Sequence, residues 1–261
     1  MADAAYLEDL FGLGGKRAAV IGGGGVLAGA MATALARAGA KVAVLDLNLD
    51  AANAKADELK AAGADAMALR VDAGERSDLE AAAKAIEEAW GGADILVNAA
   101  GLNSDTPFFD ITDEEWEKLI AVDLKGVFLA CQVFGRGMVQ RRSGSIINIS
   151  SASSGPPLSK VFTYGVAKGG VNQITRFLAR EWAEVGVRVN AIVPGFFPAD
   201  QNRKLLTEER TAQIMNHTPM KRFGEPGELV GALLWLAGDK ASGFVTGALV
   251  RVDGGFSAMT I

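Results

Sequence analysis

The sequence predicts an α/β fold in which a parallel sheet of about seven strands is covered by helices on both faces. Short runs of β-branched and other apolar residues alternate along the chain with longer alanine-rich segments of helical period. This alternation is typical of repeated strand–helix–strand units, and strands buried on both faces of a parallel sheet form apolar runs of this kind. No internal repeat or linker-like stretch divides the 261 residues, so we expect a single domain.

In chain order, the predicted strands span residues 17–21, 41–46, 66–71, 95–98, 145–149, 187–193 and 248–252. The predicted helices lie near residues 27–38, 49–62, 77–89, 113–140, 162–184 and 226–237. Residues 195–223 form the only long irregular region in this interpretation. Because a long insertion after the carboxyl end of a strand often forms a ligand-binding lid, we assign a substrate loop to about 195–223 within a single domain of residues 1–261.

Composition and charge exclude several classes of partner. The chain carries 26 Lys and Arg against 31 Asp and Glu, a formal net charge of −5, and no dense basic face for nucleic acid phosphates. Its apolar stretches are shorter than the roughly 18 to 20 residues that span a bilayer, and no secretory signal is recognised. Cys131 is the only cysteine, so no intrachain disulfide is expected. We expect a cytoplasmic protein that binds small molecules, with no nucleic acid or membrane partner.

A glycine cluster separates the first predicted strand from the first predicted helix. Gly23, Gly25 and Ala28 satisfy the pattern G-x-G-x-x-G/A. Glycines at this turn let backbone N–H groups approach a pyrophosphate at the amino end of a helix. The pattern predicts a doubly wound, dinucleotide-binding fold of the Rossmann type, although a strand-to-helix turn without a ligand would also satisfy it.

An acidic residue ends the second predicted strand. Asp46 follows the glycine loop at about the spacing at which a carboxylate accepts hydrogen bonds from the ribose hydroxyls of NAD. The same carboxylate would repel the 2′-phosphate of NADP. The sequence therefore favours NAD over NADP, with a turn-forming or helix-capping aspartate as the alternative.

Polar residues also follow the third and fourth predicted strands. Asp72 comes after one of them, and the segment from Asn98 to Gly101 comes after the other. The carboxyl ends of parallel strands share one edge of the sheet, so Asp72 is positioned to bind an adenine amine while Gly101 leaves room for the nucleotide. Each residue is also compatible with a helix cap or a turn. Together they are better explained by one bound dinucleotide.

A serine, a tyrosine and a lysine follow the fifth predicted strand. Tyr164 and Lys168 are four residues apart and so share one helical face, where the ammonium group favours the ionised phenol. Such a phenol is suited to proton exchange with an alcohol or a carbonyl oxygen, and the Ser151 hydroxyl could donate to the same oxygen. The alternative is a packed tyrosine beside a solvated lysine.

Together, these motifs resemble the short-chain dehydrogenases/reductases along nearly the whole chain. The matching segments are the glycine loop with Asp46, then Asp72, NAAG at 98–101, Ser151 with YxxxK at Tyr164 and Lys168, PG at 194–195, and VDGG at 252–255. The resemblance implies an NAD(P)-dependent oxidoreductase that forms a homotetramer or homodimer. It implies that Tyr164 is the acid/base, that Lys168 holds the nicotinamide ribose and that Ser151 stabilises the substrate oxygen. The cofactor-binding positions it implies are Gly22, Gly25, Val26, Leu27, Asp46, Leu47, Asp72, Ala73, Asn98, Ala99, Gly101, Tyr164, Lys168, Pro194, Gly195 and Phe197.

The sequence departs from the family pattern in three places. The glycine loop carries Ile21 where the family usually has threonine, and Val26 and Ala28 where it usually has glycine. Asp123 stands where the family usually carries an asparagine as the fourth member of its catalytic group, and an ionised aspartate only accepts hydrogen bonds. Ala199 replaces a threonine that contacts the nicotinamide carboxamide in many members.

The segments PGFFPADQNRKLL and HTPMKRFGEP are similar to one sugar-acid branch of the family, the D-mannonate oxidoreductases, or fructuronate reductases. The resemblance implies D-fructuronate and D-mannonate as substrates. Such molecules carry a carboxylate and several hydroxyls, so the pocket should provide a cation and amide groups. The substrate-binding candidates are Ser151, Asn103, Lys160, Gln201, Asn202 and Arg203. Solvated surface positions are the alternative for Lys160 and Arg203.

The single histidine, His217, has no Cys or carboxylate cluster near it in the sequence, so it is interpreted as a loop residue and no metal site is expected. Two other functions stay open. One is a related gluconate, polyol or ketone dehydrogenase with the same chemistry. The other is an NAD-binding protein with little activity, which the altered glycine loop and Asp123 would explain.

Overall fold

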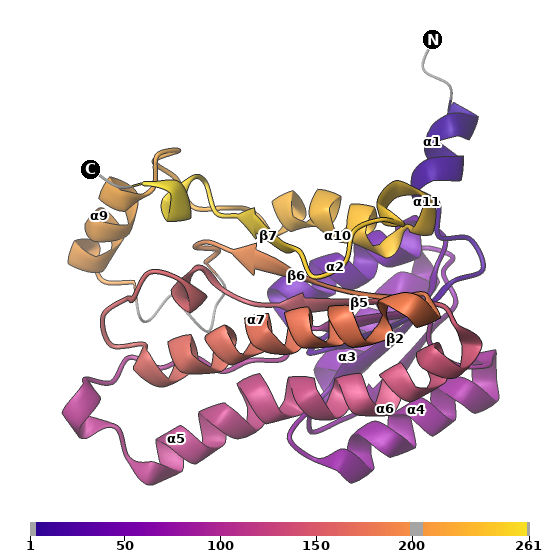
Figure 1. The fold of residues 1–261 in the computed structure, drawn as a ribbon, viewed down its shortest axis with the longest axis horizontal. Helices are drawn as coiled ribbons and strands as arrows, with labels where there is room; N and C mark the ends of the chain where they lie inside the picture. Colours follow the sequence, from indigo (N-terminus) through magenta and orange to yellow (C-terminus); the bar gives the residue numbers. More distant parts are fainter. Residues whose placement is uncertain (1–3, 199–205, 260–261) are drawn as a thin grey trace.

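The computed structural model describes residues 4–198 and 206–259. Its centre is a seven-stranded parallel sheet in the order β3-β2-β1-β4-β5-β6-β7, which confirms the predicted fold class (Figure 1). Each strand boundary lies within one residue of the predicted boundary. The strands are β1 (Arg17–Ile21), β2 (Lys41–Asp46), β3 (Ala66–Arg70), β4 (Ile95–Asn98), β5 (Gly144–Ile149), β6 (Val187–Pro194) and β7 (Leu249–Val252).

Helices cover both faces of the sheet, above and below it in the view of Figure 1. Successive strand residues point to opposite faces, so Val20 joins one buried core while Ala19 and Ile21 join the other. Alanine and glycine make up most of the buried side of α2, which lets that helix pack closely on the sheet. The first core is closed by α2 (Val26–Arg37), α3 (Leu49–Ala61) and α10 (Val230–Ala237), and the second by α4 (Arg76–Trp90), α6 (Gly126–Arg141) and α7 (Phe162–Trp182).

The carboxyl ends of the strands lie level along one edge of the sheet. Ile21 of β1 pairs with Asn98 of β4, which pairs in turn with Asn148 of β5. The chain order reverses between β1 and β4, which leaves a crevice of the kind where such sheets bind ligands. Gly22 lies there with a φ of +81°, and a Cβ on it would come within 2.7 Å of the Ala100 backbone nitrogen. Glycine is therefore what lets the loops after β1 and β4 approach each other.

The helix predicted over residues 113–140 is interrupted. It begins as α5 (Asp113–Ile120), passes through a π-helical turn (Ala121–Lys125), and continues as α6. Thr112 caps its amino end by accepting a hydrogen bond from the Glu115 backbone. A π-helical turn adds one residue to the helical turn, is rare, and is frequently found at functional sites. Asp123 lies within this turn and is fully buried.

The loop predicted over residues 195–223 contains a helix, α9 (Glu208–His217). Thr207 begins it, with a side chain that accepts a hydrogen bond from the Arg210 backbone at 3.2 Å. His217 is the last residue of α9 instead of a loop residue, and its ring stands edge-on to Phe256 with centroids 4.6 Å apart. The prediction of an irregular loop was wrong here. This ten-residue helix is mostly polar, so its sequence shows only a weak helical repeat of apolar residues.

Several short elements were not predicted. Helix α1 (Ala4–Phe11) contacts α11 (Asp239–Ser242), with an ion pair between Asp9 and Lys240. The helix predicted over 226–237 begins as a 3-10 turn before it becomes α10. The 3-10 turns are η1 (Phe108–Asp110), η3 (Ala152–Ser154), η4 (Ala183–Val185), η5 (Pro226–Leu229) and η6 (Phe256–Ala258). Within the described residues, every helix is too short or too polar to cross a bilayer.

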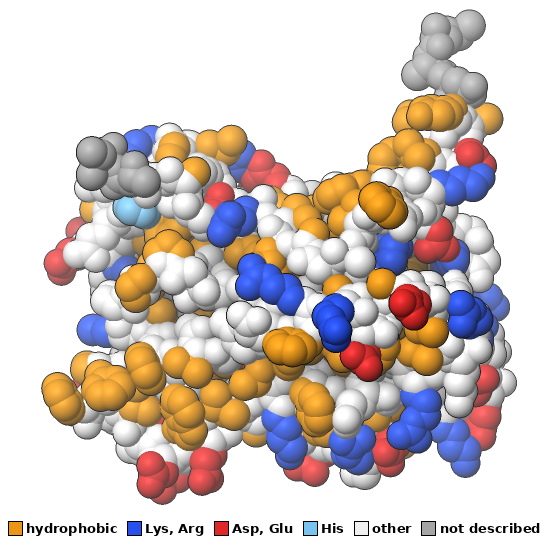
Figure 2. Space-filling model, viewed as in Figure 1, with side chains coloured by type: hydrophobic (Ala, Val, Ile, Leu, Met, Phe, Trp, Pro, Cys, Tyr) orange, Lys and Arg blue, Asp and Glu red, His pale blue; other side chains and the backbone are white. Residues whose placement is uncertain are grey.

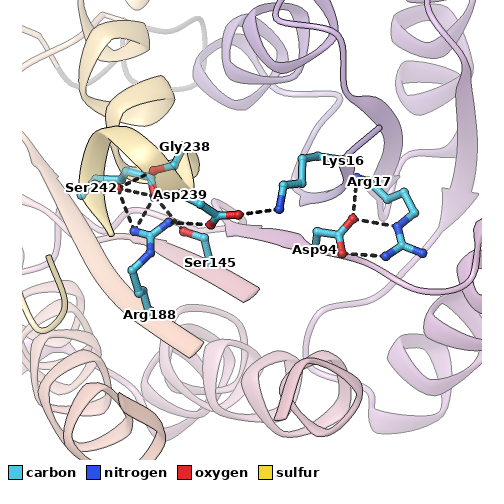
Figure 3. Close-up of polar contacts among 9 residues, drawn as sticks. Lys16, Arg17, Asp94, Ser145, Arg188, Gly238, Asp239 and Ser242 are labelled. Atoms are coloured by element: carbon cyan, nitrogen blue, oxygen red, sulfur yellow. Dashed lines mark hydrogen bonds and ion pairs between the residues drawn. The ribbon is translucent and has the colours of Figure 1, made fainter. Parts of the chain in front are cut away.

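Buried polar side chains tie the last helices to the edge of the sheet at which the strands begin (Figure 3). Arg188, near the start of β6, donates to the Leu236 carbonyl at 2.9 Å and to Ser242 Oγ at 2.8 Å. Asp239 lies 3.4 Å from the Arg188 guanidinium and also pairs with Lys16. Burial lowers the pKa of Arg188, and Asp239 opposes this. Arg188 therefore anchors α10 and α11 to β6.

A second ion pair fixes the start of β1 at the same edge. Arg17 Nη2 lies 2.6 Å from Asp94 Oδ1, and Arg17 Nε lies 2.7 Å from Asp94 Oδ2 (Figure 3). This two-pronged geometry is the strongest arrangement for such a pair. Burial alone would raise the pKa of Asp94, but the hydrogen bonds and charge of Arg17 hold it below its usual value. The pair joins β1 to the residue that precedes β4.

Candidate active site

Tyr164 and Lys168 lie one turn apart near the start of α7, on a common face. Lys168 Nζ is 5.5 Å from the centroid of the Tyr164 ring. Tyr164 is half-buried, whereas Lys168 is only 3% exposed. The ammonium group therefore lies beneath the phenol, away from solvent, where its charge is poorly screened. The helical spacing places the pair as the sequence predicted.

Asp123 is the ionic partner of this lysine. Its Oδ1 lies 3.1 Å from Lys168 Nζ, and both side chains are almost fully buried. Lys168 Nζ also donates to the Ile149 carbonyl at the end of β5, at 3.2 Å. Burial alone would lower the pKa of Lys168, but the Asp123 carboxylate, with a smaller contribution from Tyr164, raises it above its ordinary value. Lys168 is therefore held as a cation.

The π-helical turn and the loop after β4 hold Asp123 in place. The Leu102 backbone N–H donates to Asp123 Oδ2 at 2.8 Å. A Cβ on Gly101 would come within 2.7 Å of Asp123 Oδ1 and 3.4 Å of Lys168 Nζ, so only glycine leaves room for the pair. Burial raises the pKa of Asp123 above its ordinary value, although Lys168 opposes the shift. The charge of Asp123 thus depends on its neighbours.

Ser151 follows β5 and faces the same space as Tyr164. Its Oγ is 2.7 Å from Ser153 Oγ and accepts a hydrogen bond from the Ser153 backbone at 3.2 Å. Ser151 and Tyr164 both line a cavity of about 150 Å³. The predicted positions that line this cavity are Leu27, Asn103, Ser151, Tyr164, Pro194, Gly195 and Phe197. The cavity thus brings an acid/base candidate and a hydroxyl donor together.

The ends of β1 and β2, with the start of α2, have the features of a dinucleotide site. Helix α2 begins at Val26 without a side-chain cap, which leaves the N–H groups of its first turn for an anion. Asp46 accepts hydrogen bonds from the Gly24 and Asn48 backbones, each at 3.0 Å. A carboxylate has about four lone-pair positions, so Asp46 keeps acceptor capacity for ribose hydroxyls. These residues fit a dinucleotide.

The other predicted cofactor positions follow the ends of neighbouring strands. Asp72 Oδ1 accepts from the Gly74 backbone at 2.9 Å, so part of this carboxylate stabilises its own turn. Asn98 is buried, and its side-chain amide donates to Asn148 at 2.8 Å. The remaining predicted positions at this edge are Gly22 and Gly25 after β1, Leu47 after β2, Ala73 after β3, and Ala99 and Gly101 after β4.

The structure does not place all the predicted substrate ligands together. Asn103 lines the cavity. Lys160 does not line it: Lys160 Nζ lies 3.8 Å from Asp105 Oδ1, and the side chain is 52% exposed. Its backbone is left-handed, with a φ of +62°, a conformation that no sequence pattern indicated. Ala199, Gln201, Asn202 and Arg203 lie outside the described residues.

Arg210 lines the cavity and was missed in the sequence. It lies in the first turn of α9, and its Nη1 is 3.5 Å from Asp105 Oδ1. The signal that could have found it is Thr207 followed by two glutamates, a helix-start pattern. That pattern would have placed Arg210 on a helix over the cavity instead of in an irregular loop. In the part of the chain that the structure describes, no cluster of His, Cys, Asp and Glu could hold a metal ion.

Comparison with known proteins gives matches over nearly the whole chain. Residues 25–257 match a family model described as enoyl-(acyl carrier protein) reductase. The 5-keto-D-gluconate 5-reductase of Escherichia coli (strain K12) is 36% identical over 250 residues, covering 95% of this chain and 98% of that protein.

Two solved structures are similar in fold and sequence. A gluconate 5-dehydrogenase from Burkholderia cenocepacia J2315, in complex with NADP and tartrate, has a TM-score of 0.93 at 33% identity and covers 97% of this chain and 100% of that chain. A protein from Haemophilus influenza, described as a presumed D-mannonate oxidoreductase with bound NAD, has a TM-score of 0.90 at 36% identity. That match covers 95% of this chain and 97% of the other.

Proposed function

The chain belongs to the short-chain dehydrogenase/reductase family of oxidoreductases, and from this premise we propose that it transfers a hydride between NAD(H) and a sugar acid. The observation that carries the proposal is the shared cavity of Ser151 and Tyr164, with Lys168 buried behind the phenol. D-Fructuronate and D-mannonate are the proposed pair of substrates. A 5-ketogluconate and gluconate pair is the alternative within the same class.

In this reaction the nicotinamide would accept or supply the hydride at the substrate carbon. During reduction, the Tyr164 phenol donates its proton to the carbonyl oxygen, and during oxidation the phenolate takes a proton from the alcohol. The Lys168 ammonium stabilises the phenolate, and the Ser151 hydroxyl donates to the same substrate oxygen. Asp123 touches neither substrate nor cofactor in this scheme, so we assign it as a positioning residue for Lys168.

The sugar-acid class is supported by the names of the relatives. A 5-keto-D-gluconate reductase, a gluconate 5-dehydrogenase and a presumed D-mannonate oxidoreductase are each 33% or more identical to this chain. The cavity wall carries Ser151, Ser153 and Asn103, which can hydrogen-bond several hydroxyls. We favour the fructuronate and mannonate pair because the loop sequences after β6 resemble that branch.

NAD is the proposed cofactor because of Asp46 at the end of β2. A carboxylate there binds the two ribose hydroxyls and repels a 2′-phosphate. The relatives bind either form, since the Burkholderia structure holds NADP and the Haemophilus structure holds NAD. In this chain the next residue, Leu47, is exposed and apolar, so it cannot attract the 2′-phosphate.

We also propose that two subunits meet across α5, α6 and α7. Figure 2 shows a band of hydrophobic side chains over α5 and the first part of α7. A large contiguous patch of exposed apolar side chains is unusual on a monomer and marks an interaction surface. The patch includes Phe108, Phe109, Trp116, Phe128, Phe162, Val166 and Phe177. Phe177→Asp should dissociate the oligomer in sedimentation velocity, whereas Phe244→Asp, at another exposed phenylalanine, should not.

The first test of the function is the initial rate of NADH oxidation with D-fructuronate. NADPH, D-tagaturonate, 5-keto-D-gluconate and plain ketones are assayed in parallel. Fast turnover of D-fructuronate with NADH supports the proposal. NADH binding without turnover of any substrate would instead favour a non-catalytic NAD-binding role.

The second test is Tyr164→Phe. The variant should bind NADH as the wild type does, by fluorescence titration, and should lose about 10²- to 10⁴-fold in kcat, the usual contribution of a general acid/base. Tyr6→Phe is the matched control, because Tyr6 is the only other tyrosine and is exposed on α1. Wild-type turnover in Tyr164→Phe would refute the assigned role.

A further inference from the structure

Arg210 is the one charged side chain in the wall of the cavity that holds Ser151 and Tyr164, among the residues that the structure describes. It projects from α9, so the helix over the cavity supplies a cation. We propose that Arg210 binds the carboxylate of the substrate and so sets the preference for sugar acids over neutral sugars. This inference rests on the proposed function, because it names the group that recognises the acid.

The surroundings of Arg210 favour an anion as its ligand. Besides Arg210, the described residues lining the cavity are apolar or uncharged polar, and none is acidic. Arg210 also lines a neighbouring hollow of about 260 Å³ that likewise lacks acidic residues. Its side chain is 22% exposed, so an ion pair formed there is screened less than one on the open surface.

The present partners of Arg210 leave much of the guanidinium unused. Nη1 is 3.5 Å from Asp105 Oδ1, and Nη2 is 3.4 Å from the Ser159 carbonyl. Both distances exceed the 2.7 to 2.9 Å of a strong charged hydrogen bond. A guanidinium has five N–H donors in a planar fork that matches a carboxylate. A substrate carboxylate can therefore gain two short bonds where the described residues provide only long ones.

Among the described residues, Lys160 is the competing cation predicted from the sequence, and its geometry is less suitable. It contacts the same Asp105 carboxylate, with Nζ 3.8 Å from Oδ1, but it does not line the cavity and is 52% exposed. Its ion pair is therefore a surface contact, which contributes little. Asp105 pairs with both cations, so each cation is replaced in turn. An effect seen only when Arg210 is replaced indicates loss of a cavity ligand, whereas an effect seen with either replacement indicates loss of a partner of Asp105.

The test compares two substrates that differ only at one carbon. D-Fructose carries a CH₂OH group where D-fructuronate carries the carboxylate, and L-sorbose is the corresponding neutral form of 5-keto-D-gluconate. The measured quantity is the ratio of kcat/KM for the acid to kcat/KM for its neutral counterpart. Where turnover of the neutral sugar is too slow to measure, KM for the acid carries the test.

Arg210→Met should lower this ratio about 10- to 100-fold, as expected for loss of hydrogen bonds to a charged group. Arg210→Lys should recover part of the loss, because it keeps the charge but not the fork. Arg37→Met, which removes an exposed arginine at the end of α2, is the matched control. Thermal unfolding of each variant checks that the fold is intact.

Two results would overturn the inference while the proposed function stands. One is an unchanged ratio in folded Arg210→Met with sugar acids still turned over. The other is a loss of the ratio in Lys160→Met but not in Arg210→Met. No turnover of any sugar acid by the wild type would refute the proposed function itself, and would remove the carboxylate on which the inference depends.

Discussion

Replacing Asp123 with asparagine tests how the buried ion pair controls the proposed acid/base. Lys168 Nζ lies 5.5 Å from the centroid of the Tyr164 ring and 3.1 Å from Asp123 Oδ1. The carboxylate oxygen is therefore at most about 9 Å from the ring centroid. It neutralises part of the field with which the ammonium stabilises the phenolate. Asp123→Asn removes that opposing charge and keeps the size of the side chain.

The size of the effect follows from Coulomb's law. At about 9 Å and an effective dielectric constant of about 20, a unit charge contributes about 2 kcal/mol. At constant pH this corresponds to about a 30-fold change in a rate or equilibrium constant. A carboxylate disfavours negative charge on the phenol oxygen, so its removal should raise kcat/KM for alcohol oxidation at pH 7, where Lys168 is charged, by up to about 30-fold. The gain should disappear at higher pH, because Asp123 raises the pKa of Lys168 and its removal lets Lys168 lose its charge there.

The assay is kcat/KM for oxidation of the preferred alcohol from pH 5 to pH 10, on the wild type and on Asp123→Asn. The control is Glu117→Gln, which removes an exposed carboxylate from α5. An unchanged or lower kcat/KM at pH 7, or a gain that persists to pH 10, would refute the reasoning. Asp123→Asn should also unfold at lower temperature, because Lys168 is left buried beside a neutral partner.

Three further substitutions test other parts of the structure. Asp46→Ala should raise kcat/KM with NADPH relative to NADH about 10- to 100-fold, because it removes a carboxylate that repels the 2′-phosphate. A variant that keeps the wild-type ratio of the two kcat/KM values would contradict the cofactor proposal. Arg188→Met should lower the unfolding free energy by about 2 to 3 kcal/mol and the Tm by about 4 to 12 °C, because it removes the charged donor to the Leu236 carbonyl. The control, Arg180→Met on the exposed side of α7, should change neither quantity. Asp94→Asn should lose stability at pH 7, measured by urea unfolding. Arg17 holds the pKa of Asp94 below its usual value. The ion pair therefore stabilises the fold fully above the usual pKa of an aspartate, and this stabilisation is lost as the pH falls through the lower pKa of the folded protein. The gap between wild type and variant should therefore narrow below about pH 4, and a gap that persists there would show that the pair does not act through its charge.

The strands and the long helices were predictable because their signals are local. An apolar run bounded by glycine or a polar residue marks a strand, and the strand ends place the glycine loop, Asp46 and Asn98 on one edge by topology alone. The spacing of Tyr164 and Lys168 is likewise a property of one helix. None of these predictions needed a contact between distant segments.

The features that were missed depend on such contacts. The π-helical turn at Asp123 is coupled to tertiary packing, because Gly126 follows it directly and a Cβ there would meet the Ala73 carbonyl at 2.9 Å. Lys160, a predicted substrate ligand, has a left-handed backbone and lies against Asp105 instead. Arg210 reaches the cavity only because α9 folds over it. Each of these is a consequence of the assembled molecule, not of a local pattern.

The helix that carries Arg210 contributes to neither buried core. Among the described residues from Leu206 to Phe223, none belongs to the two clusters of apolar side chains that hold the helices on the sheet. The anchoring network around Arg188 lies at the opposite edge of the sheet. Apart from the buried Ile214 and Thr218, residues of this segment can therefore change without disturbing the two large cores. Substitutions confined to this surface segment can therefore change which sugar acid the fold accepts. The residues that perform proton transfer and those that stabilise the fold need not change.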